Sequence, residues 1–126
     1  MSAEENLRVA KALTDAFESM DMGAMDRLMA DDVIWHEIGR SEPRRGKAAL
    51  REGAPDSSGV GYEITATAHD TLASDDHAIV LTNATATRGG KTFEYRTAEI
   101  YHIKDGKLTE RWAFSDDTAA IAAFFA

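Results

Sequence analysis

The sequence predicts one α+β domain, in which a curved antiparallel sheet wraps around N-terminal helices and encloses an internal pocket. Three observations lead to this prediction. Helical periodicity dominates residues 2–29 and returns at the C-terminus, residues 62–115 alternate as strands, and Gly89-Gly90 and Asp105-Gly106 mark hairpin turns. Helices followed by a strand meander are typical of the α+β layer architecture, and 126 residues suit a single domain over residues 1–126.

The first helix is predicted from Ala3 to Met20. Ser2 and Glu5 form a capping-box start, and Gly23 supplies a stop signal. Its apolar residues recur every three or four positions, which is the period of an amphipathic helix. They are Ala3, Leu7, Ala10, Leu13, Phe17 and Met20.

A second short helix follows, with Met25, Leu28 and Met29 facing inward. Residues 33–38 are rich in branched and aromatic side chains and predict a short strand. We expect a loop at 39–45, which contains Pro43, then a small helix at 46–52 and a flexible connection at 53–61.

Four strands are predicted next, at Tyr62–Leu72, His77–Arg88, Thr92–Lys104 and Lys107–Ser115. A last helix, at 116–125, carries Ile121, Phe124 and Phe125 as its apolar stripe.

Composition and charge exclude several classes of function. The formal net charge of −8 argues against nucleic acid as a partner, since nucleic-acid binding needs clustered basic surface. No apolar run approaches the roughly 20 residues that span a bilayer, and no signal pattern opens the chain. The absence of cysteine is compatible with a cytoplasmic location, and the four histidines lack metal-ligand spacing, so we expect neither a metal nor a cofactor.

The Asp105-Gly106 turn sets the register of the last hairpin. If Lys104 pairs with Lys107, uninterrupted alternation puts Glu99 opposite Trp112 and brings three carboxylates onto one face with aromatic residues. A carboxylate among aromatic side chains is costly unless it is paired, protonated or beside a wet cavity, so we expect a pocket. The face would carry Phe93, Tyr95, Thr97, Glu99, Tyr101, Leu108, Glu110, Trp112, Phe114 and Asp116. Pairing across Gly89-Gly90 adds small residues that leave room: Ala78, Val80, Thr82, Ala84 and Ala86.

The order of elements resembles the NTF2-like superfamily with its cone-shaped fold. Within it, residues 30–52, with Glu37 and the stretch Ser41-Glu42-Pro43-Arg44, are similar to ketosteroid isomerases and SnoaL-like polyketide cyclases. The pattern Asp105-Gly106-Lys107-Leu108, followed by Glu110, Trp112 and Asp116, is similar to the same two families. The resemblance covers nearly the whole chain.

The resemblance implies roles for three carboxylates. Glu37 falls where ketosteroid isomerases place the proton-shuttling aspartate, and Glu99 where they place a protonated acid in the oxyanion hole. Asp116 falls at the acid/base aspartate of SnoaL-like cyclases. The isomerase's oxyanion tyrosine aligns with Ala16, which has only Phe17 beside it, and the arginine of limonene epoxide hydrolases aligns with Thr97.

Each candidate has a structural alternative. Glu37 could instead form an ion pair with Arg40 or Arg44, and Asp116 could cap the last helix. His36 lies on the opposite face by alternation, although imidazole suits proton transfer near neutrality. Glu99 has no cation on its predicted face, so desolvation would keep it protonated. The substrate-binding candidates are Phe17, Trp35, Tyr95, Thr97, Glu110, Trp112 and Phe114.

Two functions remain open. One is a cofactor-independent acid/base enzyme of isomerase or cyclase type, acting on a small hydrophobic carbonyl compound. The other is a non-catalytic small-molecule-binding or dimerisation module. The face away from the pocket is expected to form a symmetric homodimer, because it carries an exposed apolar band. That band is Ile79, Leu81, Ala98, Ile100 and Ala113, edged by Arg96, His102 and Arg111.

Overall fold

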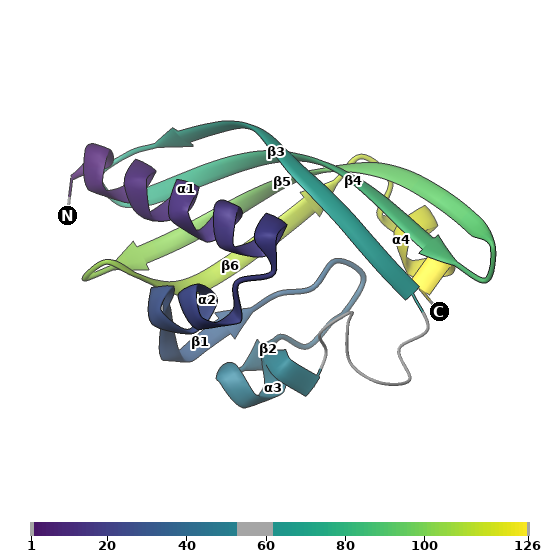
Figure 1. Cartoon of the computed structure of the whole chain (residues 1–126), viewed down its shortest axis with the longest axis horizontal. Helices are drawn as coiled ribbons and strands as arrows, with labels where there is room; N and C mark the ends of the chain where they lie inside the picture. Colours follow the sequence, from purple (N-terminus) through teal and green to yellow (C-terminus); the bar gives the residue numbers. More distant parts are fainter. Residues whose placement is uncertain (1, 53–61, 126) are drawn as a thin grey trace.

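The structure is a computed structural model that describes residues 2–52 and 62–125. These ranges form α1 (Ala3–Ser19), α2 (Met22–Leu28), β1 (Met29–Trp35), β2 (Arg44–Arg45) and α3 (Lys47–Glu52). They continue as β3 (Tyr62–Ala73), β4 (His77–Arg88), β5 (Lys91–Lys104), β6 (Lys107–Ser115) and α4 (Thr118–Phe125). Figure 1 shows α1 lying along the curved sheet and α4 at the far end, and the predicted α+β class is confirmed.

The sheet has the strand order β2-β1-β6-β5-β4-β3. Strands β3 to β6 form the predicted antiparallel meander, with Val80 opposite Glu99 and Thr82 opposite Thr97 as expected. One pair departs from the prediction, because β1 runs parallel to β6. This pairing brings the end of β1 beside the middle of β6, and the candidate site forms there.

Helix α1 begins as the sequence predicts, with the Ser2 hydroxyl accepting a hydrogen bond from the Glu5 amide. It ends differently: Met20, rather than Gly23, closes the helix in the left-handed conformation and is 52% exposed. Buried Asn6 donates to the carbonyls of Ser74 and Asp75 in the β3–β4 turn, which ties the start of the helix to the sheet.

The core lies between α1 and the inner face of the sheet, the face that α1 covers. Its buried residues are Val9, Ala10, Leu13, Met29, Val33, Ala78, Val80, Tyr101, Ile103 and Leu108. Burial of apolar side chains such as these supplies most of the driving force for folding.

Two predicted boundaries shift. The first strand begins four residues earlier than residue 33 and ends at Trp35, so His36 and Glu37 follow the strand instead of belonging to it. The last helix begins at Thr118, and the Asp117 carboxylate accepts from the Ala120 amide. The cap is therefore Asp117, not Asp116. The predicted connection at 53–61 lies outside the described residues.

A β-bulge in β6 overturns the predicted register of the last hairpin. Lys104 pairs with Lys107 and Ile103 with Leu108 as expected, but the partners then shift, so that His102 rather than Tyr101 faces Glu110. Thr109 is the extra residue, and its hydroxyl donates to the His102 carbonyl. A bulge of this kind reverses which face each later side chain occupies.

Burial explains why the bulge occurs. Leu108 is fully buried beside Tyr101, and uninterrupted alternation would send Glu110 into the same apolar layer. The extra residue keeps Leu108 inside and turns Glu110 outward. The prediction that four residues share the Glu99 face is therefore wrong. Those residues are Glu110, Trp112, Phe114 and Asp116, while Arg111, Ala113 and Ser115 now lie on the inner face.

The outer face of the sheet, opposite α1, exposes large apolar side chains. Phe114 is 59% exposed, Leu72 53% and Ile79 40%. The predicted outer band loses Ala113 and Arg111 to the inner face and gains Trp112 and Phe114. Exposed apolar surface of this kind favours association.

We propose that a second copy of the chain covers the outer face. Light scattering is expected to give about twice the 13.7 kDa chain mass at micromolar concentration. Phe114→Asp should shift the mass toward one chain, because it puts a charge into the contact. Met22→Asp, at a similarly exposed apolar residue on α2, is the matched control and should leave the mass unchanged. A one-chain mass for the unaltered protein would contradict the proposal.

Within the described ranges, no helix combines the length and the apolar character that crossing a membrane requires.

Candidate functional site

The inner face of the sheet holds an ion pair between Glu99 on β5 and Arg111 on β6. Arg111 Nε lies 3.0 Å and Nη2 2.8 Å from Glu99 Oε1. The Glu99 side chain is only 14% exposed and the Arg111 side chain only 12%. The expectation that Glu99 has no cation on its face is wrong, because the bulge turns Arg111 inward. Glu99 therefore has a guanidinium partner at hydrogen-bond distance on its own face of the sheet.

Hydroxyl groups complete the surroundings of Glu99. The Thr82 hydroxyl donates to Glu99 Oε2 at 3.2 Å, and the Thr97 hydroxyl lies 3.5 Å from the same oxygen. Burial, followed by the negative charge of Glu99 and a hydrogen bond to it, raises the pKa of the fully buried Tyr101 phenol well above its ordinary value. Tyr101 therefore stays protonated and serves as a donor. Predicted site residues Glu99 and Thr97 do belong to this network.

Arg111 also contacts β1. Its guanidinium carbon lies 4.2 Å from the centre of the Trp35 ring, and its Nη1 donates to the His36 carbonyl at 3.0 Å. Trp35 in turn packs edge-on against Phe17 of α1, at 5.9 Å between ring centres. Trp35 and Phe17 thus lie together on the inner side of the sheet, with Trp35 in contact with the Arg111 guanidinium.

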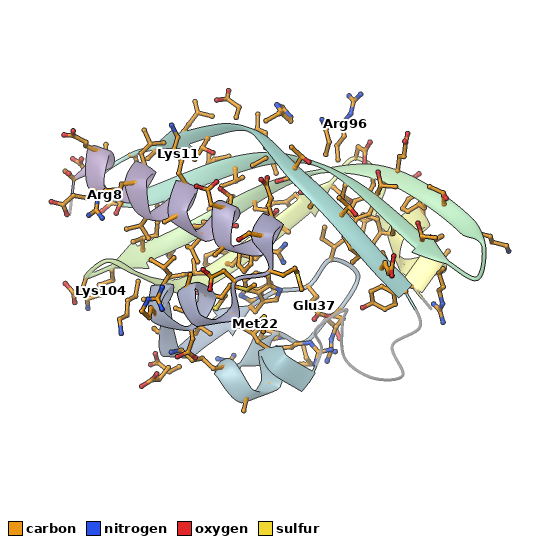
Figure 2. All side chains as sticks on the ribbon, viewed as in Figure 1. Arg8, Lys11, Met22, Glu37, Arg96 and Lys104 are labelled. Carbon is orange, nitrogen blue, oxygen red and sulfur yellow. The ribbon has the colours of Figure 1, made fainter. Side chains whose placement is uncertain are left out.

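Glu37 follows the end of β1 and appears between the sheet and α3 in the view of Figure 2. Its carboxylate forms a close ion pair with Arg44 Nε and lies 3.8 Å from Arg40. This is the ion pair that the sequence offered as the structural alternative. The Glu37 side chain is 29% exposed, so solvent or a ligand can still reach it.

Two tyrosines of the inner face, Tyr62 and Tyr95, are each influenced by one of the carboxylates Glu37 and Glu99. Burial first, and then the charge of Glu37, raises the pKa of Tyr62. The pKa of Tyr95 is also raised, first by burial and then by the charge of Glu99, and Tyr62 adds to this increase. Phe125 of α4 packs against both rings, at 4.9 Å from Tyr62 and 6.4 Å from Tyr95. The three rings therefore form one aromatic group, and each carboxylate acts electrostatically on one of its tyrosines.

The remaining predicted site residues lie on the outer face. Asp116 is exposed, and its carboxylate accepts from the Arg96 amide at 3.2 Å, so it serves the local backbone. Figure 2 shows Arg96 projecting away from the body of the molecule. An open hollow of about 300 Å³ lies here, lined in part by His69, Arg96, Phe114 and Asp116. Trp112, Asp116, Glu37 and Glu99 therefore do not line one cavity, contrary to expectation.

His36 lies on the outer face, as alternation predicts. Its Nε2 is 2.7 Å from Glu110 Oε2, and its ring stacks on Trp112 at 5.1 Å between centres. His102 contacts the same Trp112 ring, and His77 contacts His102 at 4.2 Å. These contacts gather three of the four histidines at one end of the outer face.

We expect His102 to make the stability of the protein depend on pH. Burial first, and then the neighbouring His77, lowers the pKa of His102 from 6.5, while Glu110 and Asp76 oppose the shift. Since the unfolded chain takes up that proton more readily, the stabilising contribution is present above 6.5 and is lost as pH falls through the lowered value. We expect the free energy of unfolding, measured with urea, to fall less between about pH 7 and pH 5 in His102→Gln than in the unaltered protein. An identical fall in both would contradict this assignment.

Sequence reasoning missed Arg111, Tyr101 and Thr82 as members of the inner network. Tyr101 and Thr82 stood on the predicted inner face but carried no chemical role. For Arg111, the available signal was the cost of an unpaired Glu99, which demanded a cation on one of the adjoining strands. In the described ranges, no group of three or more His, Cys, Asp or Glu side chains is placed to hold a metal ion.

Comparison with known proteins places these observations in a family. The family model described as the SnoaL-like domain matches residues 10–111. A comparison with curated protein sequences gives no significant match.

Solved structures resemble the fold over nearly its whole length. Bal32a, from a soil-derived mobile gene cassette, is 26% identical and has a TM-score of 0.88, with 98% of each chain covered. A proposed ketosteroid isomerase from Kribbella flavida is 20% identical, with a TM-score of 0.75 over 91% of this chain and 80% of its own. A proposed SnoaL-like polyketide cyclase from Jannaschia sp. CCS1 is 14% identical, with a TM-score of 0.78 over 98% and 94%. The last two show the shared NTF2-like cone alone.

Proposed function

The chain belongs to the SnoaL-like domain family, and from this membership and its inner polar network we propose that it is a cofactor-independent acid/base enzyme. Its substrate would be a small hydrophobic carbonyl compound bound against the inner face of the sheet. The reaction would be a proton transfer of the isomerase or cyclase type.

The observation that supports this proposal most strongly is the Glu99–Arg111 pair. Removing two charges from water costs several kcal/mol per ion by general estimates, and a buried pair often stabilises a fold no better than apolar residues would. Ligand sites, in contrast, commonly combine aromatic walls with a few precisely placed polar or charged groups. A buried guanidinium of this kind can bind an oxygen atom on which negative charge develops during a reaction.

Arg111 is the group that we assign to the carbonyl oxygen. A guanidinium carries five N–H donors, and its bonds to Glu99 and to the His36 carbonyl use three. Two N–H groups have no hydrogen-bond partner among the described residues. A fixed cation with spare donors can stabilise the negative charge that develops on an enolate oxygen. Glu99 holds the guanidinium in place, with Thr82 and Thr97.

Glu37 is the group that we assign as the base. Its carboxylate pairs with Arg44 and lies near Arg40, and its partial exposure allows a substrate to approach. Asp116, the other acid/base candidate, is exposed on the outer face and has no role in this proposal.

The test is exchange of substrate α-protons into deuterated water, followed by NMR over a panel of small hydrophobic ketones. The proposal expects exchange above the buffer rate for at least one ketone, with saturation as the ketone concentration rises. Saturable binding without any exchange would instead support the second candidate, a binding module, for which the same aromatic inner face is suited.

A further inference from the structure

Residue 36 is held by Arg111 through its backbone. The His36 amide donates to the Arg111 carbonyl at 2.9 Å, and Arg111 Nη1 donates to the His36 carbonyl at 3.0 Å. The first bond continues the pairing of β1 with β6. The second bond comes from the same guanidinium that binds Glu99 on the inner face.

The side chain of His36 is held on the other face of the sheet. Its Nε2 lies 2.7 Å from Glu110 Oε2, and its ring is nearly parallel to Trp112, with an angle of 7° between the planes. Glu110 and Trp112 directly precede and follow Arg111 along β6. Three consecutive residues of β6 therefore hold one residue of the β1 end from both faces.

This contact stands at the point where β1 leaves the sheet. Strand β1 ends at Trp35, and the His36 amide then makes the last backbone bond to β6 that continues this pairing. Trp35 carries the Arg111 guanidinium on its ring, and Glu37 is the assigned base. A rotation of residue 36 would therefore displace an acceptor of Arg111, the ring beneath it and the base together.

We propose that His36 and Glu110 are positioning residues for the inner site. Their pair on the outer face holds the end of β1, and so fixes the orientation of the Arg111 guanidinium and of Glu37 on the inner face. His36 itself does not meet the substrate. The catalytic consequence rests on the proposed function, whereas the effect on the Arg111 guanidinium does not.

The first test needs no substrate. The Nε–H of Arg111 gives an NMR resonance that disappears in Arg111→Lys and is thereby assigned. Glu110→Gln and His36→Phe should speed its exchange with solvent about tenfold or more, because each removes a charge-assisted contact that holds the β1 end. His36→Phe keeps an aromatic ring on Trp112, so it separates the bond to Glu110 from the stacking.

Matched controls exclude a general loosening of the sheet. Glu94→Gln removes an exposed carboxylate of β5 that lies on the outer face, as Glu110 does. His102→Phe replaces another histidine that contacts Trp112. Both should leave the Arg111 resonance and its exchange unchanged. If His36→Phe fails to fold, Glu110→Gln decides alone. If the Arg111 Nε–H exchanges with solvent at the unaltered rate in a folded Glu110→Gln variant, the proposal is overturned.

A second readout separates positioning from plain stability. On a ketone that the unaltered protein turns over, Glu110→Gln should lower kcat about tenfold with little change in KM, since it misaligns the site without removing a contact to the substrate. An equal kcat overturns the positioning role. If no ketone is turned over, the proposed function fails, while the resonance test still decides whether the outer pair orients Arg111.

Discussion

Arg111→Met is expected to destabilise the protein by about 3–5 kcal/mol, as urea denaturation would measure it. The substitution leaves the Glu99 carboxylate buried at 14% exposure without its cation. The two threonine hydroxyls and Tyr101 then remain as its donors, and they do not neutralise a charge.

A double variant isolates the ion pair from the rest of the network. Glu99→Gln combined with Arg111→Met removes both charges but keeps an amide oxygen for the hydroxyls of Thr82, Thr97 and Tyr101. It should recover more than half of the stability lost in Arg111→Met. Equal losses in the single and double variants would mean that the charge pair is not the source of the effect.

Glu37→Gln is expected to slow substrate proton exchange on the order of 10²-fold or more, because an amide cannot accept the proton. Urea denaturation should show only a small loss of stability, since the side chain is partly exposed and Gln can still accept from Arg44.

Asp116→Asn is the matched control for this change. It removes a carboxylate from the same predicted set, but Asp116 lies on the outer face, and an Asn oxygen can still accept from the Arg96 amide. Exchange at the unaltered rate is expected. Loss of exchange in Asp116→Asn, with none in Glu37→Gln, would move the chemistry to the outer face.

The sequence was sufficient for the architecture because its signals are local. Ser2 caps α1 by a bond three residues away, and the Asp105-Gly106 turn joins β5 to β6 with both residues at positive φ. Alternation on β1 correctly put Trp35 and His36 on opposite faces. Such features depend on short-range geometry that residue types determine.

The site was less predictable because one extra residue reverses a face. Nothing in Leu108-Thr109-Glu110 alone marks a bulge. The decision comes from competition between burying Leu108 and burying Glu110, which depends on Tyr101 and the helices that cover the inner face. As a result, the side chain beside Glu99 is Arg111, whereas uninterrupted alternation predicted Trp112. Non-local packing therefore determined the chemistry that the local pattern left open.

The ion pair of Glu37 shows a different limit. Arg40 and Arg44 were both recognised as partners from the sequence, and the structure places both near the carboxylate. Whether such a pair is only structural or also positions a base depends on the substrate, which the sequence does not contain. The inner network around Arg111 is what favours the catalytic alternative.

The most direct test of a proton-transfer site on the inner face is α-proton exchange of one ketone by three folded proteins. These are the unaltered chain, Glu37→Gln and the double variant Glu99→Gln/Arg111→Met. We expect saturable exchange by the unaltered chain and a loss on the order of 10²-fold in each of the others, one lacking the base and the other the guanidinium. Undiminished exchange by the folded double variant would contradict a proton-transfer site on the inner face.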